Sequence, residues 1–209
     1  KSFIDKTTNI IFLEKIKTEN YYENKNTYKK DEKTIKTRDG KLKVHLLKDS
    51  LRIIKQFKKN IKNKIILDFG CGTGEFLYNS QKIFKKGFGI EPDKSRIQYS
   101  ENNKIKFFKN IKEIEKLNLK FDSIFLFHVF EHLINPIEIL IQLKSKLKKN
   151  GILIIEVPHA NDLLLSKLRL KSFVNFTLWS EHLILHTKRS LKCFLEKAGF
   201  KKNKIFFYQ

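Results

Sequence analysis

The 209-residue sequence predicts an α/β fold in which helices cover both faces of a parallel sheet, preceded by a helical lid. From residue 64 onward, short apolar runs alternate with segments of helical periodicity, which is typical of parallel strands joined by crossover helices. The first of these runs ends in a glycine-rich turn, whereas the preceding part of the chain is polar. We therefore expect two parts: a helical N-terminal lid or cap over residues 1–60 and a ligand-binding sheet domain over residues 61–209.

Two segments of the N-terminal part have the spacing of amphipathic helices. Apolar residues recur at helical intervals over Asn9–Lys17 and again over Leu42–Phe57. The segment between them, Glu19–Gly40, is weakly patterned. We expect it to be either a flexible lid or a surface arm ahead of the sheet domain.

The strands expected in the sheet domain are short, apolar and separated by helical segments. They are Ile65–Phe69, Gly87–Glu91, Ile105–Phe108, Asp122–Phe127 and Ile152–Val157. The helices between them are Glu75–Phe84, Asp93–Glu101, Ile111–Leu117 and Pro136–Lys148. Asp93 suits a helix N-cap and Pro136 suits a first helical turn. The tail adds an expected helix over Ser190–Ala198 and an expected strand near Lys204–Tyr208.

Composition narrows the class of protein. Hydrophobic residues make up 41% and charged residues 32% of the chain, which is the composition of a globular protein. No apolar stretch approaches the roughly 18 residues that a membrane span needs. Cys71 and Cys193 have no partner at metal or redox spacing, so we expect a reducing, cytoplasmic location. The sequence has no methionine, so we expect the true start of the protein to lie upstream of Lys1.

The net charge of +22 raises the question of a polyanionic partner. Of the 44 basic residues only five are arginine, the residue best suited to bidentate contacts with phosphate. The lysines are spread along the whole sequence, and Lys, Asn, Ile, Phe and Tyr all use A/T-rich codons. The composition therefore favours solvated lysines in an A/T-rich bacterium over a nucleic-acid-binding face.

The glycine-rich turn excludes two common nucleotide loops. The segment Asp68–Gly74 places glycine at every second position after the first strand. The dinucleotide fingerprint G-x-G-x-x-G does not fit. If it began at Gly70 its third glycine would be at position 75, which is Glu75, and if it began at Gly72 the third glycine would be at position 77, which is Leu77. A phosphate-binding P-loop also fails, since no Gly-Lys-Ser/Thr follows. The spacing thus favours a ligand without phosphates.

Two carboxylates follow the first two strands and suit a cationic nucleoside. Asp68 ends the first strand, where it can accept a hydrogen bond from an ammonium group or a water. Glu91 ends the second strand, where an acidic residue can accept hydrogen bonds from the two hydroxyls of a ribose. The alternative for Glu91 and the following Pro92 and Asp93 is a simple strand end and helix cap.

These segments together resemble a known family. Ile65–Gly74 resembles motif I of class I S-adenosylmethionine-dependent methyltransferases, and Phe88–Asp93 is similar to the motif that follows it. His128–Leu133 resembles the V-x-E-H signature of a subgroup that includes ubiquinone-pathway and small-RNA 2′-O-methyltransferases. Leu147–Leu153 matches the family's turn into strand five, so the match spans about residues 64–200. The resemblance implies a Rossmann-like sheet and S-adenosylmethionine as cofactor.

The resemblance also implies which residues contact the cofactor: Asp68, Gly70, Cys71, Gly72, Gly74, Glu91, Pro92, Asn110, Ile111 and Phe127. Asn110 stands where the family often has an aspartate for the adenine amine, and an amide can still bond the adenine edge. The family usually ends with a hairpin of strands six and seven, whereas this sequence stops at Gln209. Either that last strand lies beyond this sequence or the protein does without it.

His128, Glu131 and His132 are spaced at i, i+3 and i+4, so they share one face if the turn is helical. We expect this face beside the reactive end of the cofactor, because ligands bind at the carboxyl ends of parallel strands. One interpretation is a general base, His128 or His132, oriented by Glu131. Another is a divalent metal site, since two imidazoles and a carboxylate are suitable ligands. A third is that His132 is a core histidine that caps a helix.

Resemblance to the small-RNA enzymes extends the metal interpretation. Those enzymes use Glu-x-x-Glu-His as metal ligands and add a later histidine. His128 stands at the first of these positions, and His182 is the best positional match for the later histidine. The implied ligand set is therefore His128, Glu131, His132 and His182. His159 is expected to face the acceptor, and His186 is expected at the surface or at a helix cap.

The sequence thus predicts a methyltransferase that acts on an oxygen of a small anionic metabolite, such as a sugar, phosphate-bearing or nucleotide-linked precursor of surface polysaccharide. The alternative is metal-dependent RNA 2′-O-methylation, which the charge and the histidines favour. A third hypothesis is a binding module without catalysis, which Asp68, Glu91 and Glu131 argue against. We expect a small-molecule acceptor rather than nucleic acid as partner.

Overall fold

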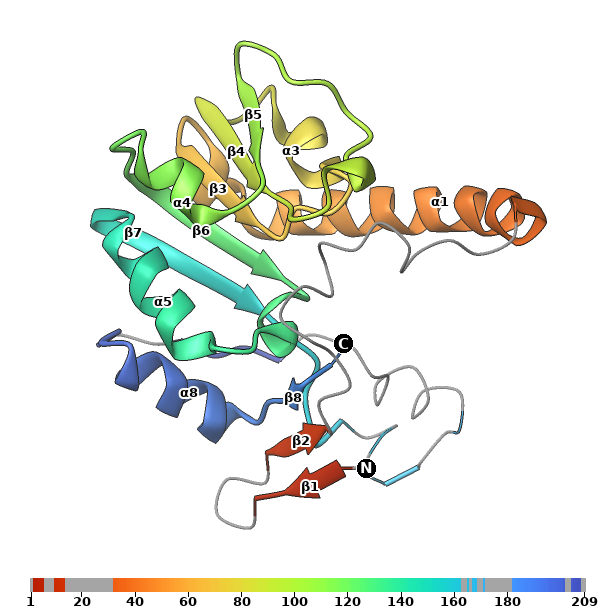
Figure 1. The fold of residues 1–209 in the computed structure, drawn as a ribbon, viewed down its shortest axis with the longest axis vertical. Coiled ribbons are helices and arrows are strands. Elements are labelled where there is room, and N and C mark those ends of the chain that lie inside the picture. The colour runs from red at the N-terminus through yellow and green to blue at the C-terminus, as the bar shows by residue number, and fades with distance from the viewer. Residues whose placement is uncertain are drawn as a thin grey trace. The chain divides into compact units, whose positions relative to one another are not determined.

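The fold is described from a computed structural model, which describes residues 2–5, 10–13, 32–162, 165, 167–168, 171, 182–201 and 204–207 (Figure 1). The chain divides into two compact units. We call Glu19–Phe125 with Lys146–Ile154 the sheet unit. We call Lys1–Thr18, Leu126–Ser145 and Ile155–Gln209 the histidine unit. The boundary between the units falls within strands β6 and β7.

A five-stranded sheet forms the centre of the sheet unit. In chain order its strands are β3 (Ile65–Phe69), β4 (Lys86–Ile90), β5 (Ile105–Phe108), β6 (Phe121–Phe127) and β7 (Leu147–Glu156). In space the order is β5-β4-β3-β6-β7, and the β5–β4, β4–β3 and β3–β6 pairs are parallel. Numbered along the chain, this order is 3-2-1-4-5, which is the order of a Rossmann-like sheet. The expected α/β class and all five expected strands are confirmed.

The helices of the sheet unit are α1 (Glu32–Gln56), α2 (Lys58–Ile61), α3 (Glu75–Ser80) and α4 (Ile111–Glu115), with a 3₁₀ turn η2 over Lys94–Arg96. Helix α1 packs against α3. The rings of Phe57 and Phe76 meet the buried ring of Phe125 edge-on, with centroids 6.2 and 5.2 Å away. These aromatic contacts bury the face of β6 beneath the helices.

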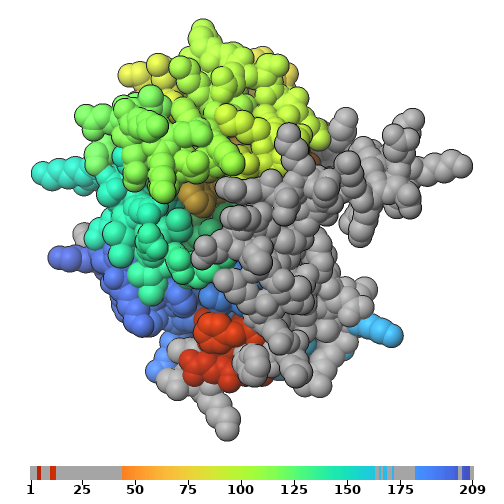
Figure 2. All heavy atoms as spheres, viewed as in Figure 1, coloured from red at the N-terminus to blue at the C-terminus, as the bar shows by residue number. Residues whose placement is uncertain are grey.

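The histidine unit contains a second sheet. It is antiparallel, with the order β1 (Ser2–Ile4), β2 (Ile11–Leu13) and β8 (Ile184–Leu185). Figure 2 shows the red atoms of β1 and β2 next to the blue atoms of the C-terminal segments. The unit also contains the 3₁₀ turn η3 (Phe130–His132) and the helices α5 (Pro136–Ser145) and α8 (Lys188–Lys197), which pack together.

The expected helix over Asn9–Lys17 is wrong, because Ile11–Leu13 forms strand β2. A short run of consecutive apolar residues fits a buried strand as well as a helix, and here β8 supplies a pairing partner from far along the chain. Residues 14–17 lie outside the described residues. The expected N-terminal lid is therefore not helical throughout. The division into a cap over 1–60 and a domain over 61–209 stays a prediction.

Two further expected elements differ from the structure. The helix over Asp93–Glu101 is only the turn η2, although Asp93 does cap it by accepting a hydrogen bond from the Ser95 N–H at 3.0 Å. The chain leaves the helical path because the Gln98 N–H donates to the Thr73 carbonyl, at 3.0 Å, and ties this segment to the glycine loop. The strand expected near Lys204–Tyr208 is also wrong, since residues 204–207 form no strand.

Within the described part of the chain, no helix combines the length and the apolar character needed to cross a membrane.

Candidate functional site

A glycine loop follows β3. Gly70, Gly72 and Gly74 have φ angles of 80°, 54° and 82°, in the left-handed region that residues with a Cβ rarely adopt. The N–H groups of Gly70 and Cys71 both donate to the carbonyl of Ile90, at 2.8 and 2.9 Å. The loop is therefore fastened to the end of the neighbouring strand β4.

Glycine is required here by crowding as well as by φ. A Cβ on Gly74 would lie 2.9 Å from the ring of Phe107. A Cβ on Gly89, in β4, would lie 2.6 Å from the same ring and 2.7 Å from the sulfur of Cys71. Phe107 and Cys71 thus fill the space beneath the loop, and the backbone above them has to be bare.

Two buried carboxylates lie at the ends of the first two strands. Asp68 is 4% exposed and Glu91 is 3% exposed. Burial, and then the charge of Glu91, raises the pKa of Asp68 to about 7. Burial also raises the pKa of Glu91, although Arg96 and two backbone N–H groups oppose the shift. A cationic ligand would relieve the repulsion between the two carboxylates.

Glu91 is linked directly to the glycine loop. Its Oε2 accepts a hydrogen bond from the Gly72 N–H at 3.0 Å, and its Oε1 accepts one from the Asp93 N–H at 3.2 Å. The guanidinium of Arg96 lies 3.5 Å from Oε1. Sequence reasoning missed Arg96, since its position five residues after Glu91 falls in the expected helix. A strand end and a cap therefore describe only part of the contacts of Glu91, because its carboxylate also faces the glycine loop.

The other residues expected to contact the cofactor differ in burial and in the element on which they lie. Cys71 and Ile111 are buried, and burial raises the pKa of the Cys71 thiol, which favours its neutral form. Pro92 is exposed. Asn110 is the N-cap of α4, where its side-chain oxygen accepts a hydrogen bond from Glu113 N–H at 3.2 Å. Phe127 ends β6 and belongs to the histidine unit.

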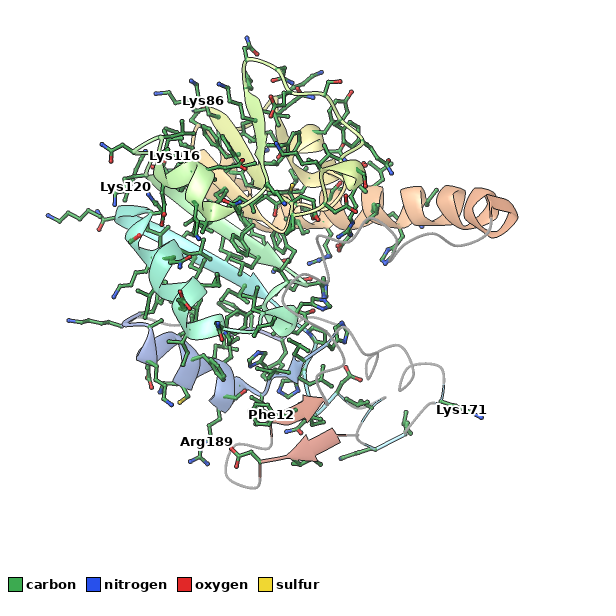
Figure 3. All side chains as sticks on the ribbon, viewed as in Figure 1. Phe12, Lys86, Lys116, Lys120, Lys171 and Arg189 are labelled. Atoms are coloured by element: carbon green, nitrogen blue, oxygen red, sulfur yellow. The ribbon has the colours of Figure 1, made fainter. Side chains whose placement is uncertain are left out.

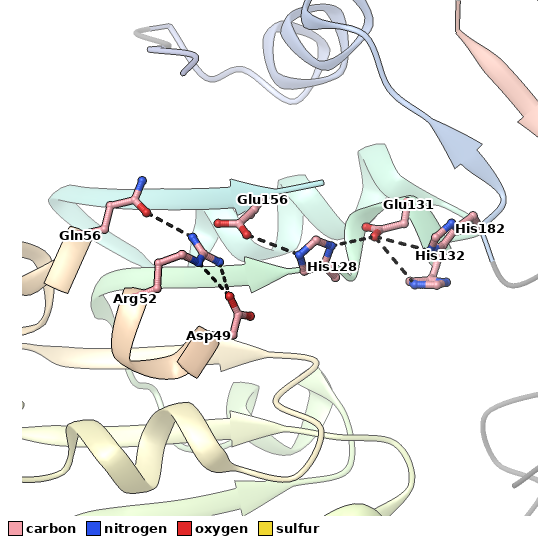
Figure 4. Close-up of polar contacts among 8 residues, drawn as sticks. All are labelled: Asp49, Arg52, Gln56, His128, Glu131, His132, Glu156 and His182. Carbon is pink, nitrogen blue, oxygen red and sulfur yellow. Dashed lines mark hydrogen bonds and ion pairs between the residues drawn. The ribbon is translucent and has the colours of Figure 1, made fainter. Parts of the chain in front are cut away.

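Glu131 is the centre of the candidate catalytic cluster (Figure 4). Its side chain is 0% exposed, and within the described part of the chain neither of its carboxylate oxygens accepts a hydrogen bond. Three imidazole nitrogens surround Oε1: Nδ1 of His128 at 3.7 Å, Nε2 of His132 at 3.9 Å and Nε2 of His182 at 4.0 Å. A buried carboxylate without hydrogen bonds is costly, so this group calls for a proton or a cation.

His128 stands apart from the other two histidines. It has a φ of 53°, and its N–H donates to the Glu156 carbonyl at 2.9 Å. Its Nε2 lies 3.4 Å from Oε1 of Glu156. The carboxylates of Glu131 and Glu156 raise the pKa of His128 to about 10. The two carboxylates thus favour the protonated form of His128, whereas a general base has to be neutral, so the base role of His128 stays a prediction. Glu156, which the sequence reasoning missed, ends the fifth strand of the sheet.

Glu131, His132 and His182 form a tighter group. One ligand atom from each lies within 4.8 Å of the others, and the two rings are 4.8 Å apart. His182 arrives from a distant part of the chain because the Leu183 N–H donates to the Glu131 carbonyl at 2.8 Å. Two imidazoles and one carboxylate form a donor set that first-row divalent metals accept. His128 was expected in the same ligand set, but its ring lies between the carboxylates of Glu131 and Glu156.

The remaining histidines of this unit differ in burial, since His186 is buried and His159 is half-buried. His186 is 1% exposed and its ring stacks on Phe130 at 4.9 Å, so the expectation of a surface position is wrong. Burial lowers the pKa of His186 to about 4. His159 pairs with His186 through the backbone, and burial lowers its pKa as well. The ring of His186 is therefore neutral at pH 7.

A sheet of this order with two carboxylates and a bare glycine loop at its strand ends suits a cationic nucleoside, and these are the features of class I S-adenosylmethionine-dependent methyltransferases. A family model described as a methyltransferase domain matches residues 44–204, and the chain belongs to this family.

Relatives and solved structures agree with this class. The chain is 27% identical, over 161 residues, to tRNA U34 carboxymethyltransferase of Campylobacter jejuni, covering 73% of this chain and 55% of the relative. It is 33% identical, over 126 residues, to ubiquinone biosynthesis O-methyltransferase of Pelagibacter ubique, covering 54% of this chain and 51% of the relative. The chain thus spans about half the length of these relatives. A crystal structure of a SAM-dependent methyltransferase from Archaeoglobus fulgidus superposes with a TM-score of 0.60 at 27% identity, covering 79% of this chain and 72% of the other.

Proposed function

We propose that this chain transfers a methyl group from S-adenosylmethionine to an oxygen of an acceptor that carries an anionic group. The buried Glu131, with three imidazoles around one oxygen, carries this proposal. A cluster of this kind has the groups needed to remove a proton from a hydroxyl or to hold a cation beside it. A sugar, phosphate-bearing or nucleotide-linked metabolite combines such a hydroxyl with an anionic group.

The residues of the sheet unit fit the cofactor. Asp68 and Glu91 are buried acids beside a loop whose glycines leave the backbone bare, so the site suits a sulfonium ligand with no phosphates. We assign Asp68 to the ammonium group and Glu91 to the ribose hydroxyls. When bound, S-adenosylmethionine supplies an electrophilic methyl group. The protein's task is then to hold the acceptor in line and to take up its proton.

The Glu131 cluster supports two roles. In the first, Glu131, His132 and His182 hold one divalent metal, which would acidify the acceptor hydroxyl or neutralise a neighbouring phosphate. In the second, His132 or His182 accepts the proton and Glu131 stabilises the resulting imidazolium. In both roles His128 lies between the carboxylates of Glu131 and Glu156.

Metal analysis of the purified protein separates the two roles. If the cluster holds a metal, Glu131→Gln, His132→Ala and His182→Ala should each lower metal content and activity, and a chelator should abolish activity until metal is restored. His45→Gln, at an exposed position in α1, is the matched control and should leave both unchanged. Full activity of a metal-free sample would eliminate the metal role, and the histidine whose loss dominates would be the base.

Release of S-adenosylhomocysteine in the presence of metabolite extracts tests the function itself. Product release with a sugar-phosphate or nucleotide-linked fraction would support the proposal. Undiminished release with an extract from which all hydroxyl-bearing anions have been removed would refute it. An acceptor from surface-polysaccharide biosynthesis stays a prediction. The named relatives act on other molecules, since their names refer to tRNA and to ubiquinone biosynthesis.

RNA is the second candidate acceptor, because one group of relatives is named for a tRNA position. The ribose hydroxyl beside a phosphodiester has the same chemistry as the hydroxyl of a phosphorylated metabolite. Transfer of a labelled methyl group to total RNA, compared with a matched fraction of small metabolites, distinguishes the two. Label in the RNA alone would replace the small-molecule acceptor.

A further inference from the structure

Exposed lysines gather at the edge of the sheet unit where the strands begin. We call this surface the basic edge and define it by Lys85, Lys86, Lys104, Lys116, Lys120 and Lys149, all of which are exposed. In Figure 3 the labelled Lys86, Lys116 and Lys120 project from the same side of the sheet unit. Apart from the pairs Lys85 and Lys86 and Lys116 and Lys120, successive members are more than ten residues apart in the sequence. The sequence alone therefore shows the lysines as evenly spread.

Backbone hydrogen bonds hold the strand entrances together. The Lys64 carbonyl accepts from the Lys85 N–H at 2.8 Å, and the Lys104 carbonyl accepts from the Gly87 N–H at 2.9 Å. On the other half of the sheet, the N–H of Phe121 donates to the carbonyl of Lys146, the residue before β7, at 2.8 Å. Since neighbouring strands are about 4.8 Å apart, the five entrances place positive charge along roughly 19 Å.

The opposite ends of β3 and β4 carry two buried acidic groups. Asp68 and Glu91 stand at the carboxyl ends of β3 and β4. Asp122 also lies at the basic edge, where it pairs with Lys148 at 2.8 Å. The lysines at the edge repel one another, and an anion bound across them would relieve that repulsion.

We propose that the basic edge binds the phosphodiester backbone of a nucleic acid without reading its bases. A row of flexible ammonium groups suits phosphates spaced a few ångströms apart, and lysine contacts a phosphate as a point charge whatever the sequence. The basic edge and the acidic carboxyl ends lie at opposite ends of five-residue strands, about 15 Å apart. Nucleic acid held there leaves the cofactor residues of the sheet unit free, so the inference does not depend on the identity of the methyl acceptor.

Fluorescence anisotropy with a labelled RNA duplex of arbitrary sequence, across a salt series and without S-adenosylmethionine, tests the inference. The triple variant Lys86→Gln, Lys104→Gln, Lys120→Gln should reduce the slope of log K against log salt by about two to three, at about 0.9 for each lost phosphate contact. The matched control replaces three exposed lysines of α8 by glutamine, Lys188, Lys192 and Lys197. It should leave the slope unchanged, and both variants should keep the wild-type affinity for S-adenosylhomocysteine.

Equal losses in the two triple variants would show that net charge alone drives binding, and would overturn the inference. So would equal competition by polyglutamate or by anionic lipid vesicles. If the edge variant loses its fold, acetylation of the wild-type lysines provides the second measurement. Bound RNA should protect the basic edge and not the α8 lysines, and uniform reactivity would refute the proposal.

Discussion

Asp68→Asn is expected to stabilise the unliganded protein at high pH while weakening cofactor binding. The Asp68 carboxyl has its pKa raised from 3.8 to about 7, first by burial and then by the charge of Glu91. Because the folded pKa is above the unfolded one, the stability that this group contributes is complete below pH 3.8 and is lost as pH rises to about 7. At about 1.4 kcal/mol per pH unit, the ionised carboxylate costs the folded protein about 4 kcal/mol.

An asparagine of the same shape does not ionise, so the variant avoids this cost. Urea unfolding at pH 5, 6, 7 and 8 should show the variant gaining on the wild type with rising pH, by up to about 4 kcal/mol above pH 7. The difference should shrink towards zero near pH 4. Two stability curves that run parallel across this range would refute the assignment of a raised pKa to Asp68.

Cofactor binding should respond in the opposite sense. A cationic ligand binds the ionised carboxylate, so calorimetry should show wild-type affinity for S-adenosylmethionine rising between pH 6 and 8. Asp68→Asn should lose about 2 kcal/mol of binding free energy and most of this pH dependence, since a bond to a charged partner is lost. A variant that binds as tightly as wild type at pH 8 would remove Asp68 from the ammonium site.

Three other substitutions test separate parts of the structure. Glu91→Ala should weaken S-adenosylhomocysteine binding by about 1–3 kcal/mol in calorimetry, and an unchanged affinity would contradict the ribose assignment. Gly89→Ala should destabilise the fold by about 2 kcal/mol in urea unfolding, because its methyl group would meet Phe107 at 2.6 Å and Cys71 at 2.7 Å; wild-type stability would show that the ring moves aside easily. Thr187→Ala removes the capping box of α8 and should lower stability by about 1 kcal/mol, whereas Thr187→Ser should retain it.

Much of the sheet could be predicted because its signals are local. Each of the five apolar runs that was expected to be a strand of the central sheet is a strand, and the expected helix Pro136–Lys148 appears as α5, three residues shorter. The failures occur where a distant segment competes with the local pattern. Gln98 bonds to the glycine loop and ends the expected helix after η2, and β8 pairs with Ile11–Leu13 in place of a helix.

The candidate site could be predicted only in part. The spacing of His128, Glu131 and His132 placed three titratable groups in one turn, but an ideal helix would have made them equivalent. The turn is instead 3₁₀, and the left-handed backbone of His128 directs its ring between Glu131 and Glu156. His182 lies beside His132, as the resemblance to the small-RNA enzymes implied, although no spacing rule connects residues fifty positions apart.

The sequence by itself determined the type of loop and the class of fold, because glycine spacing and hydrophobic period are properties of neighbouring residues. Tertiary structure decided the chemistry of the side chains. The pKa of Asp68 depends on burial beside Glu91, which only the pairing of β3 with β4 brings about. The same parallel alignment collects lysines from separate strand entrances into the basic edge. Charge and burial act through space, so their effects depend on which distant segments the fold makes neighbours.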